Sequence, residues 1–114
     1  MEGTFQNIQA RCLGKPGAVE DYPWGETVWK VGGKMFAVWG DESLGVKSTL
    51  EKQAALIMHP HIKVASYVGK YGWVAMSIED GDDLELAYDL IDESYQMVVA
   101  GLPKSKRPSE RAHG

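Results

Sequence analysis

The spacing of hydrophobic positions changes several times along the chain, and each change marks the boundary of an expected element. Helical spacing occurs in residues 4–13, in a segment that begins at Ser48 and ends before His59, and in residues 82–100. Alternating, β-branched or aromatic residues indicate a hairpin at 27–40 and strands at 44–47, 62–68 and 73–78. The order αβββαββα predicts an α+β fold, a single domain whose antiparallel sheet has about five strands with helices on one face.

The hairpin of residues 27–40 has a two-residue turn at Gly32-Gly33, a pair suited to positive φ at both positions. An uninterrupted register pairs Val31 with Lys34, Trp29 with Phe36 and Thr27 with Val38. Trp29 and Phe36 are therefore expected to face the core, whereas Met35 and Trp39 share the opposite face. That outer face is either covered by other elements or exposed as an interaction surface, and the pattern leaves both open.

The two later helices have recognisable starts. The segment Ser48–Glu51 is a capping box, and the helix after it carries Leu50, Ala54 and Ile57 on one apolar stripe. Asp82 is the expected N-cap of the last helix. This capping role explains the acidic run of residues 79–85 better than a calcium site does, because the run lacks the alternating ligands of a calcium loop.

Charge divides the chain into an acidic body and a basic end. The formal net charge is −4, yet residues 104–114 hold four basic residues against one acidic residue. Because this segment also lacks apolar residues, we expect a domain over residues 1–103 and a disordered basic tail over 104–114. An acidic body argues against strong non-specific binding to nucleic acid, so a DNA contact requires a local basic patch.

The chain contains no recognisable catalytic motif. The single cysteine, Cys12, is interpreted as a small buried residue, and neither an enzymatic activity nor a cofactor is expected. His59 and His61 have a spacing that can ligate a metal, but no third ligand of the right type lies near them in the sequence. No metal site is therefore predicted, and a metal protein using these histidines remains the least favoured alternative.

Neither a signal sequence nor an apolar run of about 18 residues is present, which predicts a cytoplasmic protein with no membrane partner.

Several short motifs together resemble a known family. They are Pro16-Gly17, Glu20-Asp21-Tyr22-Pro23-Trp24-Gly25, Gly33-Lys34-Met35-Phe36-Ala37, the short strand ending in Lys47, Lys70-x-x-Trp73, Ile91-Asp92-x-Ser94-Tyr95 and Ala100-Gly101-Leu102-Pro103-Lys104. The chain resembles the MmcQ/YjbR family of small bacterial proteins along most of its length. The resemblance implies an α+β fold of the frataxin-like or secretion-chaperone-like kind, and a DNA-binding function.

Carried over position by position, the resemblance implies a set of candidate contacts with polar or stacking capacity: Trp24, Lys34, Lys47, Lys70 and Trp73. Binding to DNA through these residues would be weak and salt-sensitive. The alternative is a protein-interaction or homodimer module that uses the face of Met35 and Trp39 and binds no nucleic acid. Lys34 is equally compatible with a role as the polar end of a turn.

Overall fold

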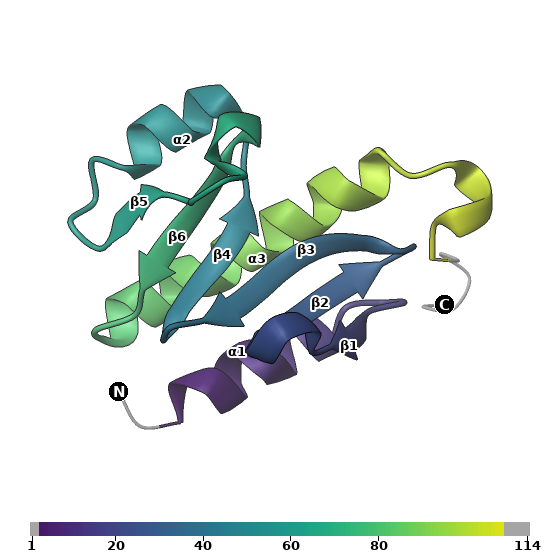
Figure 1. The fold of residues 1–114 in the computed structure, drawn as a ribbon, viewed down its shortest axis with the longest axis horizontal. Coiled ribbons are helices and arrows are strands. Elements are labelled where there is room, and N and C mark those ends of the chain that lie inside the picture. Colours follow the sequence, from purple (N-terminus) through teal and green to yellow (C-terminus); the bar gives the residue numbers. More distant parts are fainter. Residues whose placement is uncertain (1–2, 109–114) are drawn as a thin grey trace.

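The computed structural model describes residues 3–108, which form a six-stranded antiparallel sheet and three α-helices (Figure 1). The helices are α1 (Thr4–Leu13), α2 (Leu50–Leu56) and α3 (Gly81–Ala100). The strands are β1 (Val19–Asp21), β2 (Thr27–Val31), β3 (Lys34–Gly40), β4 (Ser43–Lys47), β5 (Ile62–Val64) and β6 (Trp73–Ser77), in the spatial order β1-β2-β3-β4-β6-β5. Three 3-10 turns complete the chain: η1 (Pro23–Gly25), η2 (Gly69–Tyr71) and η3 (Lys104–Lys106).

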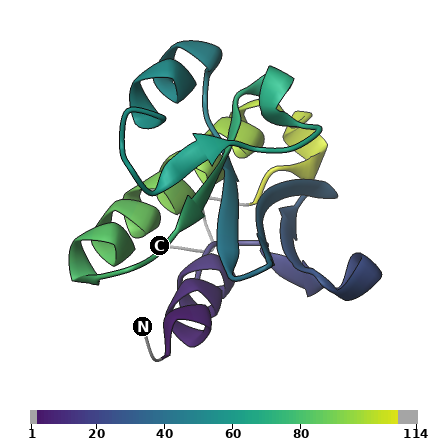
Figure 2. The same cartoon turned by 60° about the vertical axis from the view of Figure 1, so that its left-hand side comes forward.

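The α+β prediction is confirmed, and the structure adds one strand to it. The extra strand is β1, which pairs with β2 at the edge of the sheet. It was missed because it is three residues long, two of them acidic, in a linker rich in turn residues. Helix α3 packs across the central strands with α1 beside it, whereas α2 lies at the edge formed by β5 and β6 (Figures 1 and 2).

The hairpin contains a β-bulge that changes the predicted register. Lys30 pairs with Met35, but Trp29 then faces Ala37, and Thr27 faces Trp39. The extra residue is Phe36, so Phe36 and Ala37 are both buried in the core, and every later side chain of β3 changes face. The placement of Trp39 on the outer face is therefore wrong.

Trp39 instead packs against the core beside Phe5 of α1, with a ring-centroid distance of 6.1 Å. Met35 precedes the bulge and pairs with Lys30, so it stays on the face opposite Trp29, as predicted.

A single hydroxyl group joins α3 to the centre of the sheet. Ser94 is completely buried; its Oγ donates to the carbonyl of Phe36 at 2.6 Å and accepts from the backbone N–H of Lys47 at 3.0 Å. Ala37 with Val46 is the β3–β4 pair nearest to these two groups. Phe36 and Lys47 are the adjacent residues, at the point where the two strands separate. Ser94 thus satisfies the groups that the bulge leaves without a strand partner.

Helix α2 packs through Gln53 and Leu56. Its one buried residue, Gln53, donates from Nε2 to the carbonyls of Gly69 (2.7 Å) and Trp73 (2.9 Å). Leu50 is 59% exposed and Ile57 is 41% exposed, so the apolar stripe predicted for this helix faces outward.

The segment after α3 returns to the end of that helix. The guanidinium group of Arg107 donates to the carbonyls of Leu102 (2.9 Å) and Ala100 (3.0 Å), a typical use of a basic side chain at a helix C-terminus. Of the tail predicted over residues 104–114, Lys104–Lys106 form the 3-10 turn η3, and residues 109–114 lie outside the described residues. Within the described chain, none of the helices combines the length and the hydropathy that crossing a membrane requires.

We expect Ser94→Ala to lower the free energy of unfolding by about 2–3 kcal/mol, because it leaves a buried carbonyl and a partly buried N–H without partners. Urea denaturation monitored by tryptophan fluorescence measures the change. Ser66→Ala, at an exposed loop position, is the control and should change stability by less than about 0.5 kcal/mol. Equal stability of the Ser94→Ala variant and the unmodified protein would contradict the bridging role.

Candidate functional site

Four of the seven candidate residues meet at one end of the sheet. The antiparallel register places the start of β3 (Lys34), the end of β4 (Lys47) and the start of β6 (Trp73) at this end, where Lys47 pairs directly with Trp73. Together with Met35 and the last turns of α3, these residues line a pocket of about 250 Å³. The pocket thus brings together candidates that are up to 39 residues apart in the chain.

The two lysines are the accessible polar groups of this pocket. Lys34 is exposed and Lys47 is half-buried, and within residues 3–108 neither forms an ion pair. Trp73 is only 6% exposed and forms part of the pocket wall. A base could therefore not stack on the face of this indole without a rearrangement, and the chemistry offered here is that of two ammonium groups beside an apolar wall.

The remaining polar candidates lie outside the pocket. Lys70 is exposed in η2, with its ammonium 5.2 Å from the ring centroid of Tyr71. Trp24 is 97% exposed and has a left-handed backbone (φ 49°) in η1, just before β2 begins. Since β2 begins at the end of the sheet remote from Lys34, Trp24 cannot contact the same small ligand.

Gly72 holds the segment of Lys70 against the end of β4. It has φ +97°, and a Cβ atom there would lie 1.9 Å from the carbonyl oxygen of Ser48. The carbonyl of Gly72 accepts from both the N–H (3.1 Å) and the hydroxyl (2.7 Å) of Ser48. Only glycine permits this approach, which keeps η2 next to the strand end that carries Lys47.

A cluster of basic side chains and a cluster of acidic side chains lie at opposite ends of the sheet. The basic η3 lies against the hairpin turn, since Gly32 is in close contact with Leu102 and with the backbone of Lys106. The basic end consists of Lys34, Lys47, Lys104, Lys106 and Arg107. The acidic end, around the β3–β4 turn and the start of α3, consists of Asp41, Glu42, Glu79, Asp80, Asp82 and Glu85. This division matches the dipole of α3, whose N-terminus lies at the acidic end.

A second pocket, of about 550 Å³, lies on the other side of the end of α3. Lys15, Lys104 and Arg107 line it together with Tyr95 and Gln96. The ammonium of Lys15 is paired with Asp92 at 2.5 Å, and Arg107 bonds to backbone carbonyls. Lys104 is therefore the one cation of this pocket, among the described residues, that has no such partner.

Several residues of the motifs serve the scaffold. Asp92 accepts from the guanidinium of Arg11 at 3.1 and 2.6 Å, which fixes α1 to α3. The hydroxyl of Tyr95 donates to the carbonyl of Pro16 at 2.5 Å. Glu20 accepts from the indole N–H of Trp29 at 2.8 Å and so holds β1 to β2. These contacts explain the residues chemically and require no ligand.

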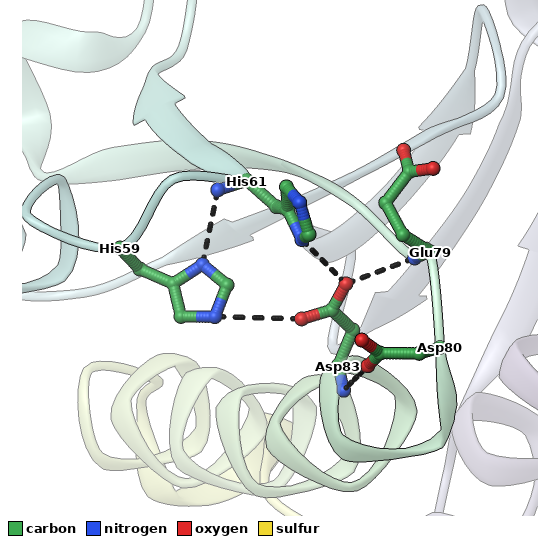
Figure 3. Close-up of polar contacts among 5 residues, drawn as sticks. All are labelled: His59, His61, Glu79, Asp80 and Asp83. Carbon is green, nitrogen blue, oxygen red and sulfur yellow. Dashed lines mark hydrogen bonds and ion pairs between the residues drawn. The ribbon is translucent and has the colours of Figure 1, made fainter.

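His59 and His61 meet a third group that the sequence did not reveal. Asp83, on the first turn of α3, is 3% exposed and points between the two imidazoles (Figure 3). Its Oδ2 lies 2.7 Å from His61 Nδ1, and its Oδ1 lies 3.4 Å from His59 Nε2. Asp83 is free for this role because Asp80, not the predicted Asp82, is the N-cap and accepts from the N–H of Asp83.

We expect Asp92→Asn to destabilise the protein at neutral pH, with a loss that fades on acidification. Burial alone would raise the pKa of Asp92, but hydrogen bonds and charges from Arg11 and Lys15 lower it below its ordinary value of 3.8. Stability from such a group is present above pH 3.8 and is lost as the pH falls through the lowered pKa of the folded state.

Urea denaturation of the protein and of the Asp92→Asn variant at neutral pH and below pH 3.8 measures this difference. Asp89→Asn, which removes an exposed carboxylate of the same helix, is the control. A difference between Asp92→Asn and the unmodified protein that stays constant with pH would contradict the assignment.

Comparison with known proteins agrees with this fold. The model of the YjbR family matches residues 13–97. A crystal structure of the Deinococcus radiodurans protein DR2400, with a domain designated DUF419, is similar to the chain with a TM-score of 0.77 and 25% sequence identity, over 90% of this chain and 83% of that one. Curated proteins give no significant match. The family match covers most of the described residues, and the chain belongs to the YjbR family.

Proposed function

We propose that the chain is a small cytoplasmic DNA-binding module whose contact surface is the basic end of the molecule. The observation that supports this most directly is the convergence of Lys34 and Lys47 on one pocket, with no ion pair to neutralise either of them in the described structure. Lys104 and Lys106 follow in η3, next to the hairpin turn. These four ammonium groups form the proposed DNA surface.

The proposal rests on the chemistry of the DNA backbone. Lysines bind phosphate as point charges, and the release of counterions from DNA supplies most of the affinity of such contacts. The net charge of −4 does not exclude this mode, because a cluster of the acidic residues lies around the β3–β4 turn and the start of α3, where it favours an orientation with the basic end towards DNA. Contacts of this kind carry little sequence information.

The other candidate residues differ in whether they can contact DNA bound at this surface. Lys70 is exposed near the end of β4 and can extend the proposed DNA surface. Trp73 supports the pocket wall and is not assigned a stacking role, and Trp24 lies at the wrong end of the sheet. The homodimer alternative loses its main residue, because Trp39 packs against the core and Met35 is half-buried in the pocket beside the end of α3. The proposal assigns the module no catalytic role.

Fluorescence anisotropy with a labelled DNA duplex and a labelled single strand tests the proposal. We expect binding at low salt, with an affinity that falls steeply as salt increases. The double substitution Lys34→Gln and Lys47→Gln should weaken binding about tenfold or more and reduce the slope of log affinity against log salt by about 2, one phosphate contact for each lysine.

Lys63→Gln, at an exposed position of β5, is the matched control because it removes the same charge away from the proposed DNA surface. It should leave affinity nearly unchanged. The proposal fails if neither DNA binds at low salt, or if Lys63→Gln weakens binding as much as a substitution at Lys34 or Lys47 does.

A further inference from the structure

His59, His61 and Asp83 form a cluster of metal-binding groups away from the proposed DNA surface. One ligand atom from each residue lies within 4.8 Å of the other two. The histidines come from the turn that enters β5, and Asp83 comes from the first turn of α3, so the cluster joins two distant parts of the chain (Figure 3). Both imidazoles are about one-third exposed, which leaves a path from solvent to the buried carboxylate.

The geometry is near that of a small metal centre. Bonds from zinc to nitrogen or oxygen measure about 2.0–2.2 Å, which places neighbouring ligand atoms of a tetrahedral centre roughly 3.3 Å apart. Oδ2 of Asp83 lies 2.7 Å from His61 Nδ1, Oδ1 lies 3.4 Å from His59 Nε2, and the three ligand atoms lie within 4.8 Å of one another, so small movements of the side chains bring them to these distances. Two nitrogens with one carboxylate suit a transition metal better than calcium or magnesium, which prefer oxygen ligands.

The positions of the hydrogen atoms on the two imidazole rings also allow a cation to bind between the rings and Asp83. Oδ2 of Asp83 accepts from the backbone N–H of Glu79 at 2.9 Å and lies 2.7 Å from His61 Nδ1. A carboxylate oxygen accepts, hence His61 donates from Nδ1, and the hydrogen of His59 lies on Nε2 because its Nδ1 accepts from the backbone N–H of His61. A metal ion can bind these two nitrogens once the single hydrogen of each imidazole has moved to its other ring nitrogen, a change of tautomer that releases no proton.

The two histidines are not equivalent in this exchange. The far nitrogen of His61, Nε2, makes no hydrogen bond within the described residues and can carry the hydrogen. The far nitrogen of His59, Nδ1, already accepts from the backbone N–H of His61 at 3.0 Å. A hydrogen there would oppose that donor, so His59 must turn its ring and give up this bond before it can ligate.

We propose that His61, Asp83 and His59 form a binding site for a divalent transition metal, with His61 and Asp83 as the main ligands and His59 as the weaker third. Water completes the coordination. The bound ion links the entry to β5 with the start of α3 and stabilises the folded protein by mass action. This site is independent of DNA binding, since its residues lie at the acidic end of the molecule.

Calorimetric titration of the full chain with Zn²⁺ at neutral pH tests the site. We expect saturable binding of one ion and a rise in melting temperature with added Zn²⁺. His61→Gln should weaken binding about 100-fold, whereas His59→Gln should weaken it only about tenfold. His113→Gln removes the remaining histidine of the sequence and should leave the affinity unchanged, because the proposed site uses His59 and His61.

A second measurement on the unmodified protein does not depend on whether the variants fold. Long-range ¹H–¹⁵N NMR spectra of the imidazoles should show that Zn²⁺ changes the signals of His61 Nδ1 and His59 Nε2 but not those of His113. The proposal is overturned if no saturable binding occurs, if Zn²⁺ affects His113 alone, or if a folded His61→Gln variant binds as tightly as the unmodified protein.

Discussion

The arrangement of this molecule depends on the hydroxyl group of Ser94. The bulge at Phe36 moves two neighbouring residues of β3 into the core and ends the pairing with β4 one step early. The carbonyl of Phe36 and the N–H of Lys47 have no strand partner, which is unfavourable away from water. The hydroxyl of Ser94 on α3 forms a hydrogen bond with each of them. The hydrogen bonds therefore fix the position of α3 along the sheet. Lys34 and Lys47 lie next to this junction, at the strand ends that the last turns of α3 adjoin.

With α3 fixed, side-chain contacts explain several polar residues of the sequence motifs without a ligand. Asp92 and Tyr95 hold α1 and the linker that follows it, and Glu20 holds the edge strand. What remains unexplained by the scaffold is the charge at the two ends of the helix. Lysines that have no ion pair in the described chain lie at one end, and the imidazole–carboxylate cluster lies at the other. The two proposals concern these two ends.

The sequence predicted the parts of the fold that depend on local chemistry. Helical periodicity and the Gly32-Gly33 turn predicted the element order apart from β1, and the resemblance to the YjbR family pointed to two lysines that the structure brings together. The bulge was not predictable, because a regular register also buries Trp29 and Phe36, and only the packing of Trp39 on Phe5 distinguishes the two. The face of α2 was ambiguous for a similar reason, since its burial is decided by the hydrogen bonds of Gln53.

Asp83 shows the limit of reasoning from spacing. It lies 22 residues after His61, within a run of carboxylates whose capping role is a sufficient explanation. Only the return of α3 beneath β5 and β6 brings it to the histidines. A signal was nevertheless present, because a helix N-terminus needs one capping carboxylate, and this run supplies several.

The most direct test of the account is a ¹H–¹⁵N NMR titration of the labelled protein with a short DNA duplex at low salt. The division of charge predicts that the largest shift changes fall on Lys34, Lys47 and residues 104–107, with little change at Asp41, Glu42 and Asp82. Changes centred on the acidic end, or none at a large excess of DNA, would contradict it.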